Sequence, residues 1–366
     1  MDWEKELKES ICSIEELKKY IKLTPEEEKQ LQTVVHKHPM RITKYYLSLI
    51  NKEDKEDPIR RLMIPSPEEL NLEGSYDTSG EEENTKTVGL QHKYKQTALI
   101  LSTNQCAAYC RFCFRKRLVG LPNHEVLDMF GKAVNYIKEH KEINNVLITG
   151  GDSLILPTKI IESFLEKLST IKHLDFIRFG SRIPVVFPNR ILNDKALLAL
   201  LKKYSLKDRR IYVVTHFNHP KEITEESINA IDQLIKSNII INNQTVLLKG
   251  VNDNPETLSN LLNKLVSIGV NPYYVFQCRP VKRVKHHFQI PLYHGLEIVE
   301  DAKKKLNGHS KRFKYVMSHK KGKIEIIGIK GDEIYFKYHQ AKNPKNIGKL
   351  FREKINKTAG WLDELN

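Results

Sequence analysis

Short apolar runs alternate with amphipathic stretches between about residues 97 and 305. The runs are continuous, which is typical of parallel strands buried on both faces of a sheet. We predict six strands: Thr97–Ser102, Asn145–Thr149, Phe176–Gly180, Arg210–Thr215, Ile239–Asn242 (extending toward Leu247) and Asn271–Gln277. The amphipathic stretches predict helices over Glu125–Glu139, Thr158–Ile171, Asp194–Lys203, Glu225–Lys236, Pro255–Ser267 and Leu292–Lys305.

Six β/α units occupy about 210 residues, which is fewer than the roughly 250 of a closed eight-unit barrel. The predicted fold class is therefore α/β, with a partial, open (β/α)6 barrel over residues 92–308. In such folds the loops at the carboxyl ends of the strands carry the chemistry.

Different patterns flank this core. Residues 1–70 predict a helical N-terminal region, in which Thr24-Pro25-Glu26-Glu27 is a helix start and another helix lies around Ile42–Asn51. Residues 52–95 are rich in Pro, Gly and acidic residues, so we expect no core there and assign 71–91 as a linker.

The C-terminal pattern, residues 309–366, predicts a small α+β cap. Three strands are expected over Phe313–Met317, Lys323–Ile329 and Glu333–Tyr338. They are followed by a basic tail that ends in a helix containing Trp361.

Composition narrows the class of protein. No apolar run approaches 18 residues, and the N-terminus lacks an apolar signal segment, so we expect a cytoplasmic protein without a membrane anchor. Lys and Arg total 60 against 45 Asp and Glu, for a net charge of +15. The lysines are mostly interleaved with Glu, so we favour a solvated surface over nucleic acid as main partner.

Three of the five cysteines, Cys106, Cys110 and Cys113, fall within eight residues. A zinc site would need a fourth ligand at tight spacing, and the nearest downstream candidate, His124, is loosely spaced. Three thiolates suit a [4Fe–4S] cluster that leaves one iron open for a ligand. Cys12 is expected to pack a helix.

A second candidate site follows the second predicted strand, where Gly150-Gly151-Asp152 stands. Two glycines leave the backbone accessible to a ligand, although a plain turn is the alternative interpretation.

The CxxxCxxC spacing followed by Gly-Gly resembles the radical S-adenosylmethionine (SAM) superfamily. The wider match is similar to the lysine 2,3-aminomutase family and spans about residues 90–310. It rests on these segments: Asn104-Gln105-Cys106, Cys110-Arg111-Phe112-Cys113-Phe114-Arg115-Lys116-Arg117, Thr149-Gly150-Gly151-Asp152, Gly180-Ser181-Arg182-Ile183-Pro184-Val185-Val186, Thr215-His216-Phe217-Asn218-His219-Pro220, Asn243-Gln244-Thr245-Val246-Leu247-Leu248-Lys249-Gly250 and Pro272-Tyr273-Tyr274-Val275-Phe276-Gln277-Cys278.

The resemblance implies a [4Fe–4S] cluster, SAM and pyridoxal 5′-phosphate (PLP), used for a 1,2-amino shift through a 5′-deoxyadenosyl radical. It implies cluster ligands at Cys106, Cys110 and Cys113, SAM contacts at Gly150, Gly151, Asp152, His216 and Gln244, and a substrate-carboxylate contact at Arg115. For His216, Gln244 and Arg115, purely structural or solvated roles are the alternative.

Two departures concern the substrate. The family's lysine-specific members carry an Asp where this chain has Arg279, and a second family Asp aligns with Ser318. A guanidinium in place of a carboxylate disfavours the distal ammonium of lysine. We therefore predict that free L-lysine is not preferred and that a glutamate-like or neutral side chain fits better.

Another departure concerns PLP. The family's PLP lysine aligns best with Lys323, then with Lys320 or Lys321, and an exposed basic hairpin is the alternative. The arginine that steadies the phosphate in the family falls near Thr97, for which Lys95 would compensate.

Two other functions stay open: radical modification of a protein lysine, and a nucleic-acid-binding Fe–S protein. The family resemblance also implies an electron donor such as flavodoxin or ferredoxin, and a homodimer.

Overall fold

The computed structural model describes residues 3–127 and 129–365. Six parallel strands pair in chain order, as predicted. They are β3 (Thr97–Thr103), β4 (Asn145–Gly150), β5 (Phe176–Gly180), β6 (Arg210–Thr215), β7 (Ile240–Leu247) and β8 (Asn271–Gln277). The sheet stays open, because the described strands run in order from β1 to β12 and the two end strands do not pair with each other.

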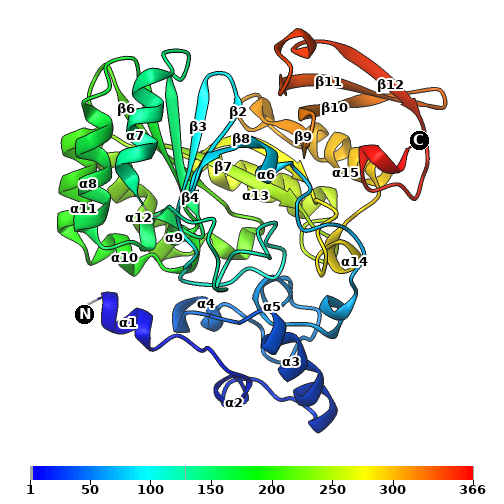
Figure 1. Cartoon of the computed structure of the whole chain (residues 1–366). Coiled ribbons are helices and arrows are strands. Elements are labelled where there is room, and N and C mark those ends of the chain that lie inside the picture. Colours follow the sequence, from blue (N-terminus) through cyan, green and yellow to red (C-terminus); the bar gives the residue numbers. More distant parts are fainter. Residues whose placement is uncertain (1–2, 128, 366) are drawn as a thin grey trace.

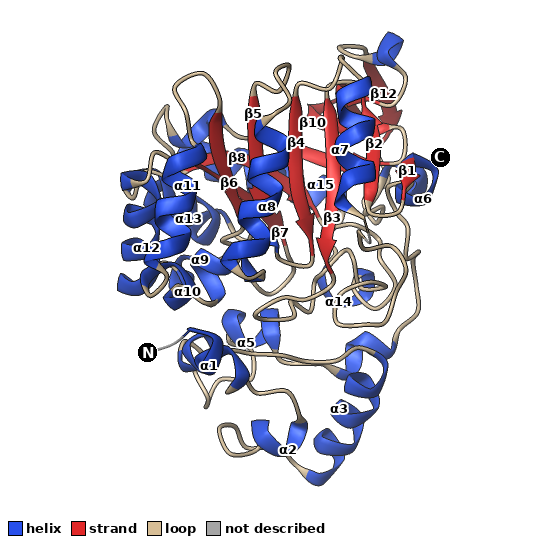
Figure 2. Ribbon diagram, turned by 60° about the vertical axis from the view of Figure 1, so that its left-hand side comes forward, coloured by secondary structure: helices blue, strands red, loops and turns tan. Residues whose placement is uncertain are grey.

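Helices pack along the outer face of these strands (Figure 2). In α8 (Thr158–Ser169), for example, the buried side chains Ile161, Phe164, Leu165 and Leu168 form one stripe toward the sheet. The other long helices of the core are α7 (Phe130–Glu139), α11 (Lys195–Tyr204), α12 (Glu225–Lys236), α13 (Pro255–Ser267) and α15 (Leu292–Lys304), and three short ones are α9 (Ile183–Val186), α10 (Asn189–Leu192) and α14 (Lys285–Phe288).

The helix expected over Glu125–Glu139 is shorter than predicted and begins at Phe130. The preceding residues are held elsewhere: the N–H of Leu127 donates to Leu101 O, and Glu125 pairs with Arg117. Residue 128, within the expected helix, lies outside the described residues.

The N-terminal region is helical, as expected, and lies on the side toward which the arrowheads of β3 and β4 point (Figure 2). Thr24 caps α3 with a complete capping box, as predicted. The helices here are α1 (Trp3–Lys8), α2 (Ile14–Leu17), α3 (Pro25–Lys37), α4 (Lys44–Ser48), α5 (Pro58–Met63) and the 3-10 turn η1 (Pro67–Leu70).

The expectation that residues 52–95 contribute no core is wrong. Asp57-Pro58 starts helix α5, in which Ile59, Leu62 and Met63 are buried, because Asp57 caps the helix and Pro58 suits its first turn. Later in this stretch α6 (Glu81–Asn84) precedes β1 (Thr85–Thr87) and β2 (Leu90–Tyr94), which extend the sheet beyond β3. β2 pairs antiparallel with β3, and β1 pairs antiparallel with β2.

At the other edge, β9 (Lys314–His319) pairs with β8 in parallel and continues the sheet. It is followed by antiparallel β10 (Gly322–Lys330) and β11 (Glu333–Ala341), as predicted (Figure 1). A further strand, β12 (Leu350–Lys354), pairs with β11 and was not predicted from the sequence of the basic tail. The tail ends in a 3-10 turn, Leu362–Glu364, rather than the expected helix. Within the described residues no helix is long and apolar enough to traverse a bilayer.

Candidate functional site

A cavity of about 340 Å³ gathers every first-choice site residue that the sequence predicted. The lining residues come from α6, from the strands β2 to β11 and from the loops that follow β3 to β6 and β8. Those predicted in advance are Cys106, Cys110, Cys113, Arg115, Gly150, Gly151, Asp152, His216, Gln244, Arg279, Ser318 and Lys323. Residues up to 217 positions apart in the chain thus face one space.

The cysteine loop is held from outside the barrel by the N-terminal region. The N–H of Tyr109 donates to Arg41 O and that of Arg111 to Leu62 O, both at 2.9 Å. The Arg41 side chain donates to Cys106 O at 3.2 Å. The conformation of the loop therefore depends on residues that precede it by some 50 to 70 positions.

A buried ion cluster reinforces the loop. Glu69, in η1, accepts from Arg111 Nη2 and Lys116 Nζ, both at 2.6 Å, and all three side chains are buried. These cations hold the pKa of Glu69 at about 2 despite its burial. Arg115, Lys116 and Arg117 are accordingly not a solvated basic run.

The three thiols fit a cluster rather than a single ion. Within the described residues, no three His, Cys, Asp or Glu side chains are arranged to hold one metal ion. Ligands of a [4Fe–4S] cluster bind separate irons, so Cys106, Cys110 and Cys113 on one cavity wall match that donor set. Burial raises the pKa of all three thiols, Cys113 to about 11, so iron must displace their protons to bind.

The other two cysteines lie apart from this group. Cys12 is exposed and does not pack a helix, contrary to expectation. Cys278 is buried and lines the cavity at the end of β8.

The glycine turn after β4 packs tightly against the cysteine loop. Gly150 has φ of +123°, and a Cβ here would collide with Thr103 O; one at Gly151 would collide with Gln105 O. The N–H of Gly151 donates to Thr103 O at 2.6 Å, so it is not free for a ligand. The glycines permit this close approach of backbones.

Asp152 organises the same turn. Its carboxylate accepts from Ser181 Oγ and from the N–H of Arg182, both at 2.6 Å, and from the N–H of Leu154 at 3.1 Å. Burial raises its pKa to about 6. Asp152 thus joins the ends of β4 and β5 beneath the cavity.

His216 offers an unsatisfied polar atom to a ligand. Its Nε2 is buried and has no hydrogen-bond partner, and its ring lies edge-on to Phe112 at 5.4 Å. Burial, with the charge of Arg182, lowers its pKa to about 3, so the ring is neutral at pH 7. Gln244, on β7, lines the same wall. These two polar groups fit the bound SAM that the family resemblance implies.

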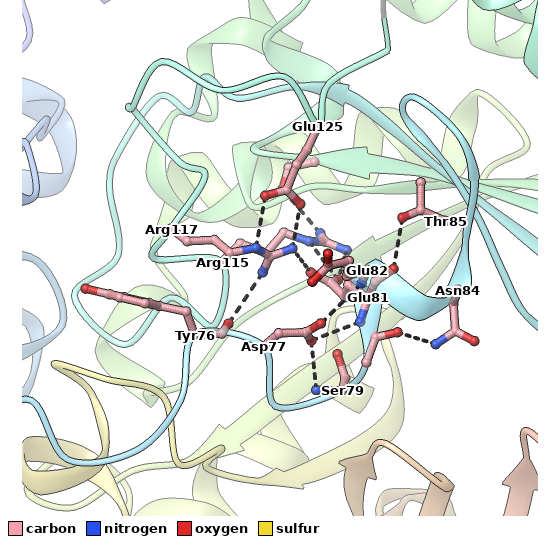
Figure 3. Close-up of polar contacts among 12 residues, drawn as sticks. Tyr76, Asp77, Ser79, Glu81, Glu82, Asn84, Thr85, Arg115, Arg117 and Glu125 are labelled. Atoms are coloured by element: carbon pink, nitrogen blue, oxygen red, sulfur yellow. Dashed lines mark hydrogen bonds and ion pairs between the residues drawn. The ribbon is translucent and has the colours of Figure 1, made fainter.

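Arg115 is already paired within the protein (Figure 3). Its Nε and Nη2 donate to Glu81 Oε1 at 3.2 and 3.1 Å, and its Nη1 donates to Gly150 O at 3.2 Å. Arg117 binds the other oxygen of Glu81 and also Glu125, each at 2.7 Å. The Glu81 carboxylate therefore already occupies the Arg115 guanidinium, which is the group expected to bind the substrate carboxylate.

Arg279 lies buried in the cavity wall. It stacks over the Phe114 ring at 4.0 Å and donates to Ser79 Oγ at 2.9 Å. Burial lowers its pKa to about 10, so it is protonated at pH 7. Ser318 lines the same cavity without contributing charge.

Of the three candidate PLP lysines, Lys323 lines the cavity, whereas Lys320 and Lys321 are exposed. The Lys323 Nζ lies 4.2 Å from the Tyr274 ring centroid. Thr97 lines the cavity but Lys95 is exposed and does not.

Three cationic side chains were missed as site residues: Lys93, Arg178 and Arg182 all line the cavity. Burial lowers the pKa of Lys93 to about 7. Arg178 has a buried Nε with no hydrogen-bond partner. A charged residue in the middle of the apolar run Phe176–Gly180 was the signal available in the sequence.

Fold and site together define a radical SAM enzyme. The profile of the radical SAM superfamily matches residues 100–262, and this domain implies a [4Fe–4S] cluster and SAM. Among solved structures, "Native anSMEcpe with bound AdoMet and Cp18Cys peptide" has a TM-score of 0.42 and 14% identity, covering 56% of this chain and 58% of its own.

Relatives specify the family. A protein of Aquifex aeolicus (strain VF5), provisionally named L-lysine 2,3-aminomutase, is 45% identical over 94% of this chain and 93% of its own. L-lysine 2,3-aminomutase of Clostridium subterminale is 40% identical over 84% and 72%. Glutamate 2,3-aminomutase of Clostridioides difficile (strain 630) is 38% identical over 82% and 70%. The chain belongs to the lysine 2,3-aminomutase family, whose members are isomerases.

Proposed function

We propose that the protein catalyses a 1,2-amino shift on a small amino acid whose side chain is anionic or neutral, and not on free lysine. The observation that carries this proposal is the buried, protonated Arg279 in the cavity wall. An ammonium group at the end of a lysine side chain would meet this guanidinium, whereas a carboxylate would pair with it.

The charge of the whole cavity supports the same substrate class. Its described lining includes the basic side chains of Lys93, Arg115, Arg178, Arg182, Arg279 and Lys323, although burial lowers the pKa of the two lysines to about 7. The carboxylates are those of Glu81 and Asp152, and both are already bound by protein groups. Such a lining favours anionic ligands.

The residues present also fit PLP, which is proposed here as a cofactor. Lys323 supplies an amine, and Lys93 and Arg178 supply basic N–H donors for a phosphate. When bound, the cofactors supply the chemistry: SAM and the cluster generate the radical, and PLP carries the migrating amine. The chain's own residues bind and orient: Arg115 would exchange its contact with Glu81 for the α-carboxylate of the substrate.

The test is a panel of amino acids incubated with SAM, PLP and the reduced, reconstituted protein, analysed for β-amino isomers. We expect turnover of glutamate or a neutral amino acid above that of lysine, and a shift toward lysine in Arg279→Asp. Lys349→Asp, an equal change of charge at an exposed residue, should leave the preference unaltered. Faster lysine turnover by the unmodified protein refutes the proposal.

The two other functions are less well supported. A protein lysine would also bring an ammonium group to Arg279, and no feature of the described cavity favours nucleic acid. Release of 5′-deoxyadenosine from SAM separates either radical reaction from a merely structural Fe–S role. The flavodoxin or ferredoxin donor, the homodimer and the cytoplasmic location stay predictions.

A further inference from the structure

Arg182, which follows β5, touches a cluster ligand directly. Its Nη1 donates to Cys110 Sγ at 2.8 Å. Apart from its contribution to the positive charge of the cavity, the substrate chemistry proposed above gives this guanidinium no specific contact.

The guanidinium is held in place by three segments of the chain. Its Nε donates to His216 O at 3.0 Å, and its Nη2 pairs with Glu222 and donates to Tyr46 OH at 3.2 Å. The rings of Tyr46 and Phe112 flank it, with centroids 5.5 and 5.3 Å away. Because Tyr46, Phe112 and Glu222 are buried, the N–H group aimed at sulfur is fixed before the cluster changes charge.

Hydrogen bonds to cysteine sulfurs are among the determinants of the potential of an Fe–S cluster. Reduction adds one electron and so one negative charge, which a fixed donor and a positive charge stabilise more than the oxidised form. We propose that Arg182 is a positioning residue that raises the reduction potential of the [4Fe–4S] cluster through Cys110, and that Tyr46 of the N-terminal region helps to hold it there.

The reaction concerned is transfer of one electron from an external one-electron donor to the cluster. No bond forms or breaks at Arg182, which stays protonated. The competing interpretation is that Arg182 binds the carboxylate of SAM, since it lines the same cavity. The two interpretations differ in the cluster potential expected without SAM. Only the first predicts that Arg182 changes that potential.

The experiment is a redox titration of the full-length, anaerobically reconstituted protein, followed by EPR without SAM or amino acid. In Arg182→Met we expect the equilibrium constant for reduction to fall at least about tenfold, which is about 59 mV toward negative potential. Arg182→Lys keeps the charge but not the forked donors. Its cluster potential should lie between those of Arg182→Met and the unmodified protein. SAM binding is measured separately on the same samples.

Arg190→Lys is the matched control. Arg190 is also a fully buried arginine paired with a carboxylate, Asp194, and stacked on an aromatic ring, Trp3, but it does not line the cavity. We expect its cluster potential to equal that of the unmodified protein.

An unchanged or more positive potential in Arg182→Met overturns the proposal, and weaker SAM binding in that case assigns Arg182 to SAM. If Arg182→Met does not take up iron, the Arg182→Lys variant provides the test. A cluster potential in Arg182→Lys equal to that of the unmodified protein then overturns the proposal. Because no amino acid is present, the outcome is independent of the substrate proposed above.

Discussion

Lys323 combines an ammonium group with a site that disfavours positive charge. Burial, followed by the charges of Arg178, Arg279 and Lys93, lowers its pKa to about 7. At neutral pH a substantial fraction of the Lys323 side chains is therefore in the free-amine form, which is the form that attacks a carbonyl. An exposed lysine would need a pH near 10 to reach the same state.

We predict that PLP binding by Lys323 follows this lowered pKa. Addition of PLP should produce a new visible absorption that increases through about pH 7, and Lys323→Ala should abolish it. Lys321→Ala, an exposed neighbour, should retain it. A midpoint near pH 10, or an equal signal in Lys323→Ala, would contradict the prediction.

The same lowered pKa has a consequence for stability. The unfolded chain keeps the Lys323 proton up to about pH 10.5 and the folded chain only up to about pH 7, so stability increases with pH between these values. The gain is at most about 1.4 kcal/mol per pH unit. Lys323→Met should therefore stabilise the cofactor-free protein most below pH 7 and progressively less above it.

Denaturant titrations at several pH values check this prediction. Lys330→Met, at an exposed position, serves as the control and should show no such trend. A constant difference in the free energy of unfolding across pH 6 to 10 would count against a buried amine.

At the scale of elements, the cysteine loop is coupled to η1 by one carboxylate. Glu69 neutralises both Arg111 and Lys116, and all three are buried. Removing one member of a buried ion cluster leaves uncompensated charge, which typically costs about 3–5 kcal/mol.

Glu69→Gln should therefore lower the free energy of unfolding by about 3–5 kcal/mol and reduce iron uptake on reconstitution. Chemical denaturation and iron analysis measure the two effects. Glu9→Gln, which breaks the exposed pair with Lys44, should change neither. A stable Glu69→Gln protein with normal iron content would show that the loop does not depend on this contact.

At the scale of the whole molecule, the larger of two buried clusters among the described residues is a contiguous core that runs from Ile11 to Leu362. It includes residues of the N-terminal helices, the parallel strands and the C-terminal strands. Two tryptophans report on its ends: Trp3 packs against the core from α1, and Trp361 is buried in it. A continuous core favours a single cooperative unfolding transition.

We predict that Trp3→Phe and Trp361→Phe, each with one remaining tryptophan, unfold with fluorescence midpoints equal to their midpoints by circular dichroism. The reason is that both ends pack into the same core. Different midpoints for the two probes within either variant would show that one region unfolds independently.

Local patterns were enough to predict the parallel strands and their order. Buried parallel strands are continuous apolar runs, and this signal needs no knowledge of distant residues. The pattern failed at residues 52–95, where Pro and Gly predict no core although Asp57 and Pro58 begin a buried helix. It also missed β12, whose exposed Leu350 and Arg352 carry no apolar run.

The spacing of Cys106, Cys110 and Cys113 by itself determined the class of chemistry, because three nearby thiolates with no fourth ligand suit few metal groups. Only the tertiary structure decided which charges meet there. Glu81 pairs with Arg115, and Arg182 donates to Cys110, through contacts between segments far apart in the chain. The charge of Lys93 likewise acts on Lys323 from a distant segment. Such pairings depend on how strands and loops converge in space. No periodicity in the sequence indicates which residue a charged side chain will pair with.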